Sequence, residues 1–152
     1  MSEFLKEVII YTDGSCLNNP GVGGWACVLI YNGNEKHLSG AENNTTNNRM
    51  ELMAIIKSLE ALKEKCIVYI HSDSSYVINA FNQNWIADWQ KKGWKNSQKK
   101  EVLNKDLWLK LLSLTNFHQV NFIKVKGHSD NEYNNLCDKL ARDAATKLSS
   151  GY

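Results

Sequence analysis

The fold depends on one stretch near the amino terminus, Val8-Ile9-Ile10-Tyr11-Thr12-Asp13-Gly14-Ser15, an apolar run that ends on an aspartate and a glycine. Apolar, β-branched residues on both faces predict a central strand covered on both sides, since a half-solvated strand alternates apolar with polar residues. Asp13 would then lie at the carboxyl end of the strand, at the rim where α/β sheets usually bind ligands. A simple turn aspartate is the alternative, because Asp-Gly-Ser also favours a tight turn.

The composition predicts an ordinary globular chain that forms one domain over residues 1–152. Hydrophobic residues make up 43% of the chain and charged residues 22%, and no apolar stretch is long enough to span a bilayer. The first seven residues lack the basic start and apolar core of a signal peptide, so we expect a cytoplasmic protein. The four cysteines stand far apart, which favours reduced thiols over a disulfide or zinc site. No heptad pattern is present, and a monomer is the expected state.

The first half of the chain predicts an antiparallel meander of three strands. Turn formers after Ser15 lead into a second apolar run, Trp25–Tyr31. Asn32-Gly33 then predicts a tight hairpin turn, because such turns need residues that accept positive φ angles. A third strand through Lys36–Leu38 would pair with the second.

The second half predicts helices alternating with parallel strands. Apolar residues at helical spacing indicate a helix that begins near Thr46, and Cys66–Asp73 repeats the pattern of the opening strand. A right-handed crossover would place this strand parallel to the first one. Residues 120–125 indicate a last, half-exposed strand, and an amphipathic helix follows. We therefore expect an α/β fold with a mixed five-stranded sheet and helices on both faces.

Four carboxylates are predicted to meet at one edge of this sheet. Asp13 and Asp73 would end adjacent strands, while Glu51 and Asp138 would reach the same edge from flanking helices. Like charges this close raise one another's pKa unless cations neutralise them, and carboxylate oxygens suit Mg²⁺ or Mn²⁺. Two ions about 3.5 to 4 Å apart can activate a water and stabilise the leaving oxygen of a phosphodiester. The alternative is that each acid is a separate, solvated surface charge.

Positive charge gathers in one short segment, although the net charge of the chain is only +2. Residues 91–100 contain no acid and five lysines, Lys91, Lys92, Lys95, Lys99 and Lys100. We expect this segment to project from the body and to contact nucleic-acid phosphates, with a solvated loop as the alternative. Trp85 and Trp89, one helical turn apart, are expected to pack with Trp94 and Trp108.

Four blocks of the sequence resemble the signature of bacterial type 1 ribonuclease H. They are Tyr11–Ser15, Thr46–Leu52, His71–Ser74 and Lys126–His128, in the same order as in that family and across nearly the whole chain. The resemblance implies a ribonuclease H-like fold with a basic handle. It also implies endonucleolytic hydrolysis of the RNA strand of RNA–DNA hybrids by two Mg²⁺ ions, with Mn²⁺ as a possible substitute, to 5′-phosphate and 3′-hydroxyl ends.

The same resemblance implies roles for individual residues. The metal ligands would be Asp13, Glu51, Asp73 and Asp138, and His128 would assist proton transfer or product release. Contacts with the hybrid would come from Gly14, Ser15, Cys16, Asn18, Thr46, Asn47, Asn48, Ser75, Trp85 and the five lysines. For Thr46 and the asparagines, helix capping is the alternative. Asn44 and Ser75 depart from the family pattern, which often has arginine and glutamine there, so each weakens a substrate contact.

Other classes of protein fit the residues less well. Actin-like ATPases share the Asp-Gly-Ser turn but need a second domain, and aspartyl-phosphate phosphatases need an acid where this chain has Ser15. Other nucleases of the same fold have clustered acids, yet the lysine segment fits them poorly. A non-catalytic hybrid-binding module remains open, although it would have no use for four acids.

Overall fold

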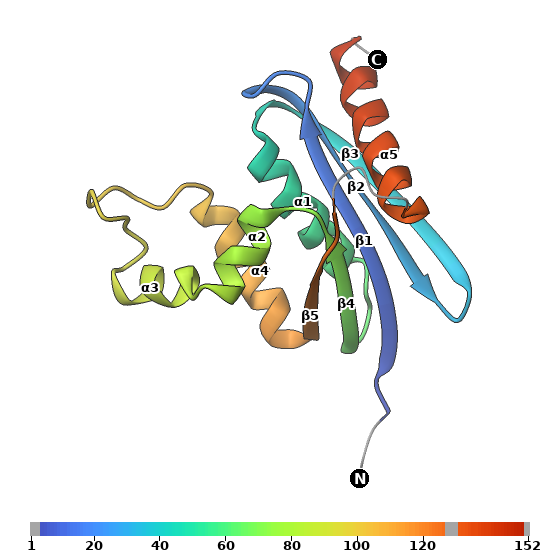
Figure 1. The fold of residues 1–152 in the computed structure, drawn as a ribbon, viewed down its shortest axis with the longest axis horizontal. Helices are drawn as coiled ribbons and strands as arrows, with labels where there is room; N and C mark the ends of the chain where they lie inside the picture. The colour runs from blue at the N-terminus through green and yellow to red at the C-terminus, as the bar shows by residue number, and fades with distance from the viewer. Residues whose placement is uncertain (1–3, 127–130, 151–152) are drawn as a thin grey trace.

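The computed structural model describes residues 4–126 and 131–150 and contains one five-stranded sheet (Figure 1). Its strands are β1 (Lys6–Cys16), β2 (Gly21–Tyr31), β3 (Asn34–Thr45), β4 (Cys66–Ser72) and β5 (Gln119–Lys124), in the order β3-β2-β1-β4-β5. The first three strands pair antiparallel, whereas β4 pairs parallel with both β1 and β5. The predicted mixed sheet, with the opening strand at its centre, is confirmed.

Helices cover both faces of this sheet. They are α1 (Asn47–Glu60), α2 (Ser75–Asn82), α3 (Trp85–Lys91), α4 (Lys105–Phe117) and α5 (Glu132–Ser149). On β2, Cys27 and Leu29 belong to the core beneath α1 and α4, while Ala26 and Val28 pack with α5 residues on the opposite face. Alternate side chains of one strand thus enter two separate layers. Within the described ranges, no helix has the length and apolar character needed to cross a membrane.

The hairpin between β2 and β3 forms where the sequence predicts it. Asn32 and Gly33 have φ angles of 50° and 78°, and the flanking residues Tyr31 and Asn34 are paired across the turn. Two positive φ angles give a turn whose twist matches that of the strands, which explains why Asn-Gly stands here.

The expectation that β1 is covered on both faces is only half right. Val8 and Ile10 are buried beneath α1, but Ile9, on the other face, is 40% exposed. The reason is that α5 contacts Ile30 and Glu35 on β2 and β3 at the level of Ile9 but leaves the amino-terminal half of β1 uncovered (Figure 1). An apolar run therefore predicted a central strand correctly but overstated its burial.

The tryptophans form the packed base of the projecting segment. Trp89 lies against three other indoles, with ring centroids 6.4 Å from Trp85, 5.9 Å from Trp94 and 5.4 Å from Trp108. Trp108 is fully buried in the main core. The predicted tryptophan packing is confirmed, and it anchors α3 to the body by contacts typical of large aromatic side chains.

His118 makes the folded state sensitive to acid. Its buried Nδ1 accepts a hydrogen bond from the Cys66 backbone N–H at 3.1 Å, and burial, aided by the charge of Lys65, lowers its pKa. The folded state therefore holds the ring neutral, so this stabilisation is present above the unfolded pKa of about 6.5 and is lost as the pH falls below it.

We predict that wild-type protein loses stability on acidification through this ring. His118→Asn keeps an acceptor near the position of Nδ1 but cannot take up a proton, so its disadvantage of about 1–2 kcal/mol at pH 7 should shrink by pH 5. Urea unfolding at pH 5, 6 and 7 in chelator measures this difference. A gap that stays constant over this range would show that His118 is not the titrating group.

Candidate active site

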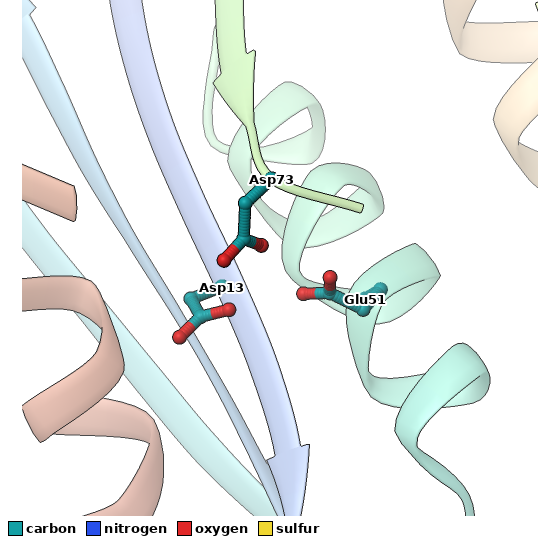
Figure 2. Close-up of side chains that lie close together, drawn as sticks. All are labelled: Asp13, Glu51 and Asp73. Carbon is teal, nitrogen blue, oxygen red and sulfur yellow. The ribbon is translucent and has the colours of Figure 1, made fainter. Parts of the chain in front are cut away.

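Three acids from three different elements meet at the carboxyl end of β1 and β4. Asp13 belongs to β1, Glu51 to the first half of α1, and Asp73 directly follows β4. One carboxylate oxygen of each can be chosen so that all three lie within 4.8 Å of one another (Figure 2). The predicted meeting of Asp13 and Asp73 at adjacent strand ends, with Glu51 beside them, is thus seen in the structure.

The strand pairing creates the space for these side chains. The last parallel pair between β1 and β4 is Tyr11 with His71, whereas Asp13 still pairs with Ala26 on β2. Beyond Tyr11 the pairing of β1 with β4 ends, so within the described residues Asp13 has no strand partner on that side. The opening is filled by the carboxylates of Asp73 and Glu51 (Figure 2).

Gly14 allows α1 to approach β1 closely enough for Glu51 to reach this opening. A Cβ at position 14 would collide with the backbone of Met50 and Glu51. The family resemblance implies that Gly14 contacts the hybrid; the structure shows that Gly14 also lets α1 approach the strand. Any larger residue here would push Glu51 away from Asp13.

Burial and mutual repulsion disfavour the charged forms of these acids, and protein groups offset this effect only in part. Asp13 is 7% exposed, and burial, followed by the charges of Asp73 and Asp138, raises its pKa from 3.8 to about 7. Burial, followed by the charges of Asp13 and Asp73, raises the pKa of Glu51 well above its ordinary value. Oε1 of Glu51 is buried and has no hydrogen-bond partner among the described residues.

This donor set fits a metal ion. A buried carboxylate oxygen without a partner is costly, and a bound cation would offset both the desolvation and the repulsion. Only oxygen ligands are present in the cluster, which suits hard divalent cations such as Mg²⁺ and Mn²⁺. The site could therefore hold metal through Asp13, Glu51 and Asp73.

Asp138 lies beside Asp13 but outside the three-acid group. Its charge acts on Asp13, but it is not part of the group whose oxygens lie within 4.8 Å of one another. Its Oδ2 instead lies 2.8 Å from Nη2 of Arg142, one turn further along α5. The sequence did not predict this ion pair. His128, the fifth predicted catalytic residue, lies outside the described residues.

The loop after β1 is tied to the start of α1 by asparagines. The Cys16 backbone N–H donates to Oδ1 of Asn47 at 2.7 Å, and the Asn47 N–H donates to Oδ1 of Asn19 at 3.2 Å. Thr46 caps the helix, since its Oγ1 accepts the Arg49 N–H at 3.2 Å. Capping is thus present at Thr46, and Asn19 is a structural contact that the sequence analysis missed. The turn-forming sequence Asn18-Asn19-Pro20-Gly21 could have indicated this contact.

The remaining predicted contacts lie around this rim. Asn18 and Asn48 are exposed, and Oγ of Ser15 is buried with no hydrogen-bond partner among the described residues. Ser75 is exposed at the start of α2, where its Oγ accepts a hydrogen bond from Lys124 at 2.6 Å. Lys124 was not predicted, because its approach to Ser75 depends on the register between β4 and β5.

The lysine segment projects from the body as expected (Figure 1). All five lysines are exposed, and none forms an ion pair with an acid among the described residues. The loop is held together by a backbone bridge between Lys95 and Glu101 and by Oδ1 of Asn96, which accepts two backbone N–H groups. Trp85 is partly buried against Trp89 at the base of this segment. The structure thus presents a cationic projection with an aromatic base.

A mixed five-stranded sheet with clustered acids at the end of its central parallel pair defines a protein of the ribonuclease H fold class. The family model for RNase H matches residues 5–146. A ribonuclease H from Thermoanaerobacter sp. strain X514 is 60% identical over 143 residues, covering 94% of this chain and 92% of that protein. One from Caldanaerobacter subterraneus subsp. tengcongensis is 62% identical, covering 93% and 94%.

A solved structure supports the same assignment. LC9-RNase H1, a type 1 RNase H, superimposes with a TM-score of 0.86 at 28% identity, covering 97% of this chain and 75% of that chain. The chain therefore belongs to the RNase H family and resembles its bacterial type 1 members.

We predict that the carboxylate cluster destabilises the metal-free protein. Because the pKa of Asp13 is raised, the folded state loses stability as the pH rises from about 4 to about 7, at about 1.4 kcal/mol per pKa unit. Asp13→Asn should therefore raise the free energy of unfolding in chelator by a few kcal/mol at pH 8 and by much less at pH 4.5.

The control for this prediction is Asp143→Asn, which removes an exposed carboxylate paired with Lys139 on α5. Its effect on unfolding should not grow with pH. Added Mg²⁺ should narrow the gap between Asp13→Asn and wild type, because ligand binding stabilises the folded wild-type chain. An Asp13→Asn variant no more stable than wild type at pH 8 would contradict the predicted repulsion.

Proposed function

We propose that this protein is a metal-dependent endonuclease that hydrolyses the RNA strand of RNA–DNA hybrids to 5′-phosphate and 3′-hydroxyl products. The observation that carries the proposal is the cluster of Asp13, Glu51 and Asp73, with a buried oxygen of Glu51 that has no partner among the described residues, in a chain of the RNase H family. A bound cation would offset the mutual repulsion of these carboxylates.

The acids and His128 have distinct proposed roles. Asp13, Glu51 and Asp73 hold Mg²⁺, with Mn²⁺ as a substitute, and Asp138 completes the set for a second ion. When bound, two such ions supply a nucleophilic water and stabilise charge on the leaving oxygen. The protein fixes its carboxylates on strand ends and on a helix, which keeps them rigid relative to the scissile phosphate. His128 assists proton transfer or product release.

The hybrid substrate is gripped at two places. The exposed lysines, Lys91, Lys92, Lys95, Lys99 and Lys100, contact phosphates of the DNA strand, with Trp85 beside them. Around the carboxylates, the backbone at Gly14 and Ser15 and the side chains of Cys16, Asn18, Thr46, Asn47, Asn48 and Ser75 face the minor groove. RNA is distinguished there by its 2′-hydroxyls, which lie in the wide, shallow groove of the hybrid.

We propose further that residues 1–152 act as a single domain, as a monomer in the cytoplasm. The four cysteines are free thiols in the structure, and three of them are buried as apolar side chains. Such cysteine usage suits a reducing compartment.

We predict metal-dependent internal cleavage of RNA in a hybrid. A circular RNA annealed to DNA, incubated with Mg²⁺, should be cut to fragments with 5′-phosphate ends, whereas chelator, an RNA duplex or a DNA duplex should give no cuts. Asp13→Asn should lower the rate by at least about 10³-fold while changing the hybrid Kd by less than about threefold. Tight binding of the hybrid with no cutting under any metal condition would instead identify a non-catalytic binding module.

We predict that the lysine segment supplies salt-sensitive affinity. Replacing all five lysines with glutamine removes phosphate contacts, so the slope of log Kd against log salt should become shallower by several units. The loss of affinity should be largest at low salt and narrow as salt screens the wild type. Replacing Lys110, which pairs with Glu60 on another part of the surface, is a single-charge control. An unchanged slope in the five-lysine variant would exclude the segment from binding.

A further inference from the structure

Lys124 places an ammonium group on the rim that carries Asp73. It is the last residue of β5 and pairs with Ser72, the last residue of β4, so both strands end at the same edge. Its Nζ donates to the backbone oxygen of Asp73 at 2.7 Å and to Oγ of Ser75 at 2.6 Å. The ammonium is thus fixed at the turn that carries a proposed metal ligand.

The ammonium of Lys124 can form one more hydrogen bond than the described residues accept. An ammonium has three donors, and among the described residues two acceptors are bound to this one. Lys124 is exposed and forms no ion pair with any carboxylate of the described chain. One donor of a full positive charge therefore remains available to an anion from solution.

The surroundings determine which anion fits. The carboxylates of the site repel a phosphate, and a cation fixed at the Asp73 backbone oxygen lowers that repulsion where a nucleic-acid backbone must approach. Ser75, one of the predicted substrate contacts, is short, and its hydroxyl is the anchor of the ammonium. The hydrogen bond holds the longer Lys124 side chain next to Ser75.

We propose that Lys124 binds a phosphate of the RNA strand next to the cleaved bond. This rests on the proposed function, because the RNA strand is placed at Asp73 only if the carboxylates act on it. The lysine segment beyond Trp85 holds the other strand, so Lys124 and that segment contact different strands of one duplex. Lys124 is then a substrate-binding residue, and Ser75 and the Asp73 carbonyl position its ammonium.

Hybrid binding in chelator tests the proposal without any cleavage. Lys124→Met should weaken binding about threefold to tenfold at 0.1 M salt and reduce the slope of log Kd against log salt by about one. Lys124→Arg should restore the slope, and Ser75→Ala should keep it with a smaller loss of affinity. Lys147→Met, at the far end of α5, is the charge-matched control and should leave the slope unchanged.

Replacing one phosphate with a neutral methylphosphonate shows which strand Lys124 contacts. When the replaced phosphate is the one beside the cleavage position in the RNA strand, wild type and Lys124→Met should bind the hybrid equally well. If the two proteins bind equally well only when the methylphosphonate is in the DNA strand, the assignment of Lys124 to the RNA strand is overturned.

Two further results would overturn the contact itself. One is a Lys124→Met variant with an unchanged salt slope. The other is a Lys124→Met variant whose only defects are a lower melting temperature and a lower kcat, which would show that Lys124 only stabilises the turn after β4. Failure of the wild type to cleave would refute the proposed function, while the salt slope would still decide the role of Lys124.

Discussion

The arrangement depends on the repulsion between carboxylates that the fold forces together. Asp13 is buried and Glu51 is partly buried, and each has a pKa raised first by desolvation and then by the other acids. In water these side chains would separate, so the surrounding structure must hold them in place. A divalent cation removes the repulsion and makes the same crowding favourable. The crowding of the three acids thus explains both the predicted instability of the metal-free protein and the fit of the site to a cation.

The scaffold supplies this geometry by backbone contacts more than by side chains. β1 continues its pairing with β2 beyond the point where it leaves β4, so Asp13 is held on one side and open on the other. Gly14 lets α1 lie against the strand, and Gly24 does the same for α5, since a Cβ there would collide with Ala141. Two helices can thus approach the central strands closely from opposite faces. The acids on these helices reach the same edge because no side chain at Gly14 or Gly24 holds the helix backbone away from the strand.

The sequence predicts this edge well because strand ends are local features. Two apolar runs that each stop on an aspartate indicate strands, and parallel pairing brings their ends together. What it could not predict depends on contacts between distant segments. The exposure of Ile9 follows from where α5 stops covering the sheet, and the position of Lys124 follows from the register with β4. Arg142 stands four residues after Asp138, a spacing that permits a helical ion pair without revealing whether the aspartate faces a metal site.

The projecting lysine segment is fixed relative to the carboxylates through the same helix that carries Glu51. Arg49, two residues earlier on α1, binds both carboxylate oxygens of Asp106 at 3.0 Å and Oδ1 of Asn104 at 3.3 Å. Asn104 also donates to the hydroxyl of Tyr76 at 3.2 Å, at the point where the segment returns to the body. A bidentate guanidinium is a rigid link, because both partners are planar and two bonds fix their orientation. Together with the packing of Trp89 on Trp94 and Trp108, this link fixes the base of the lysine segment relative to the carboxylates.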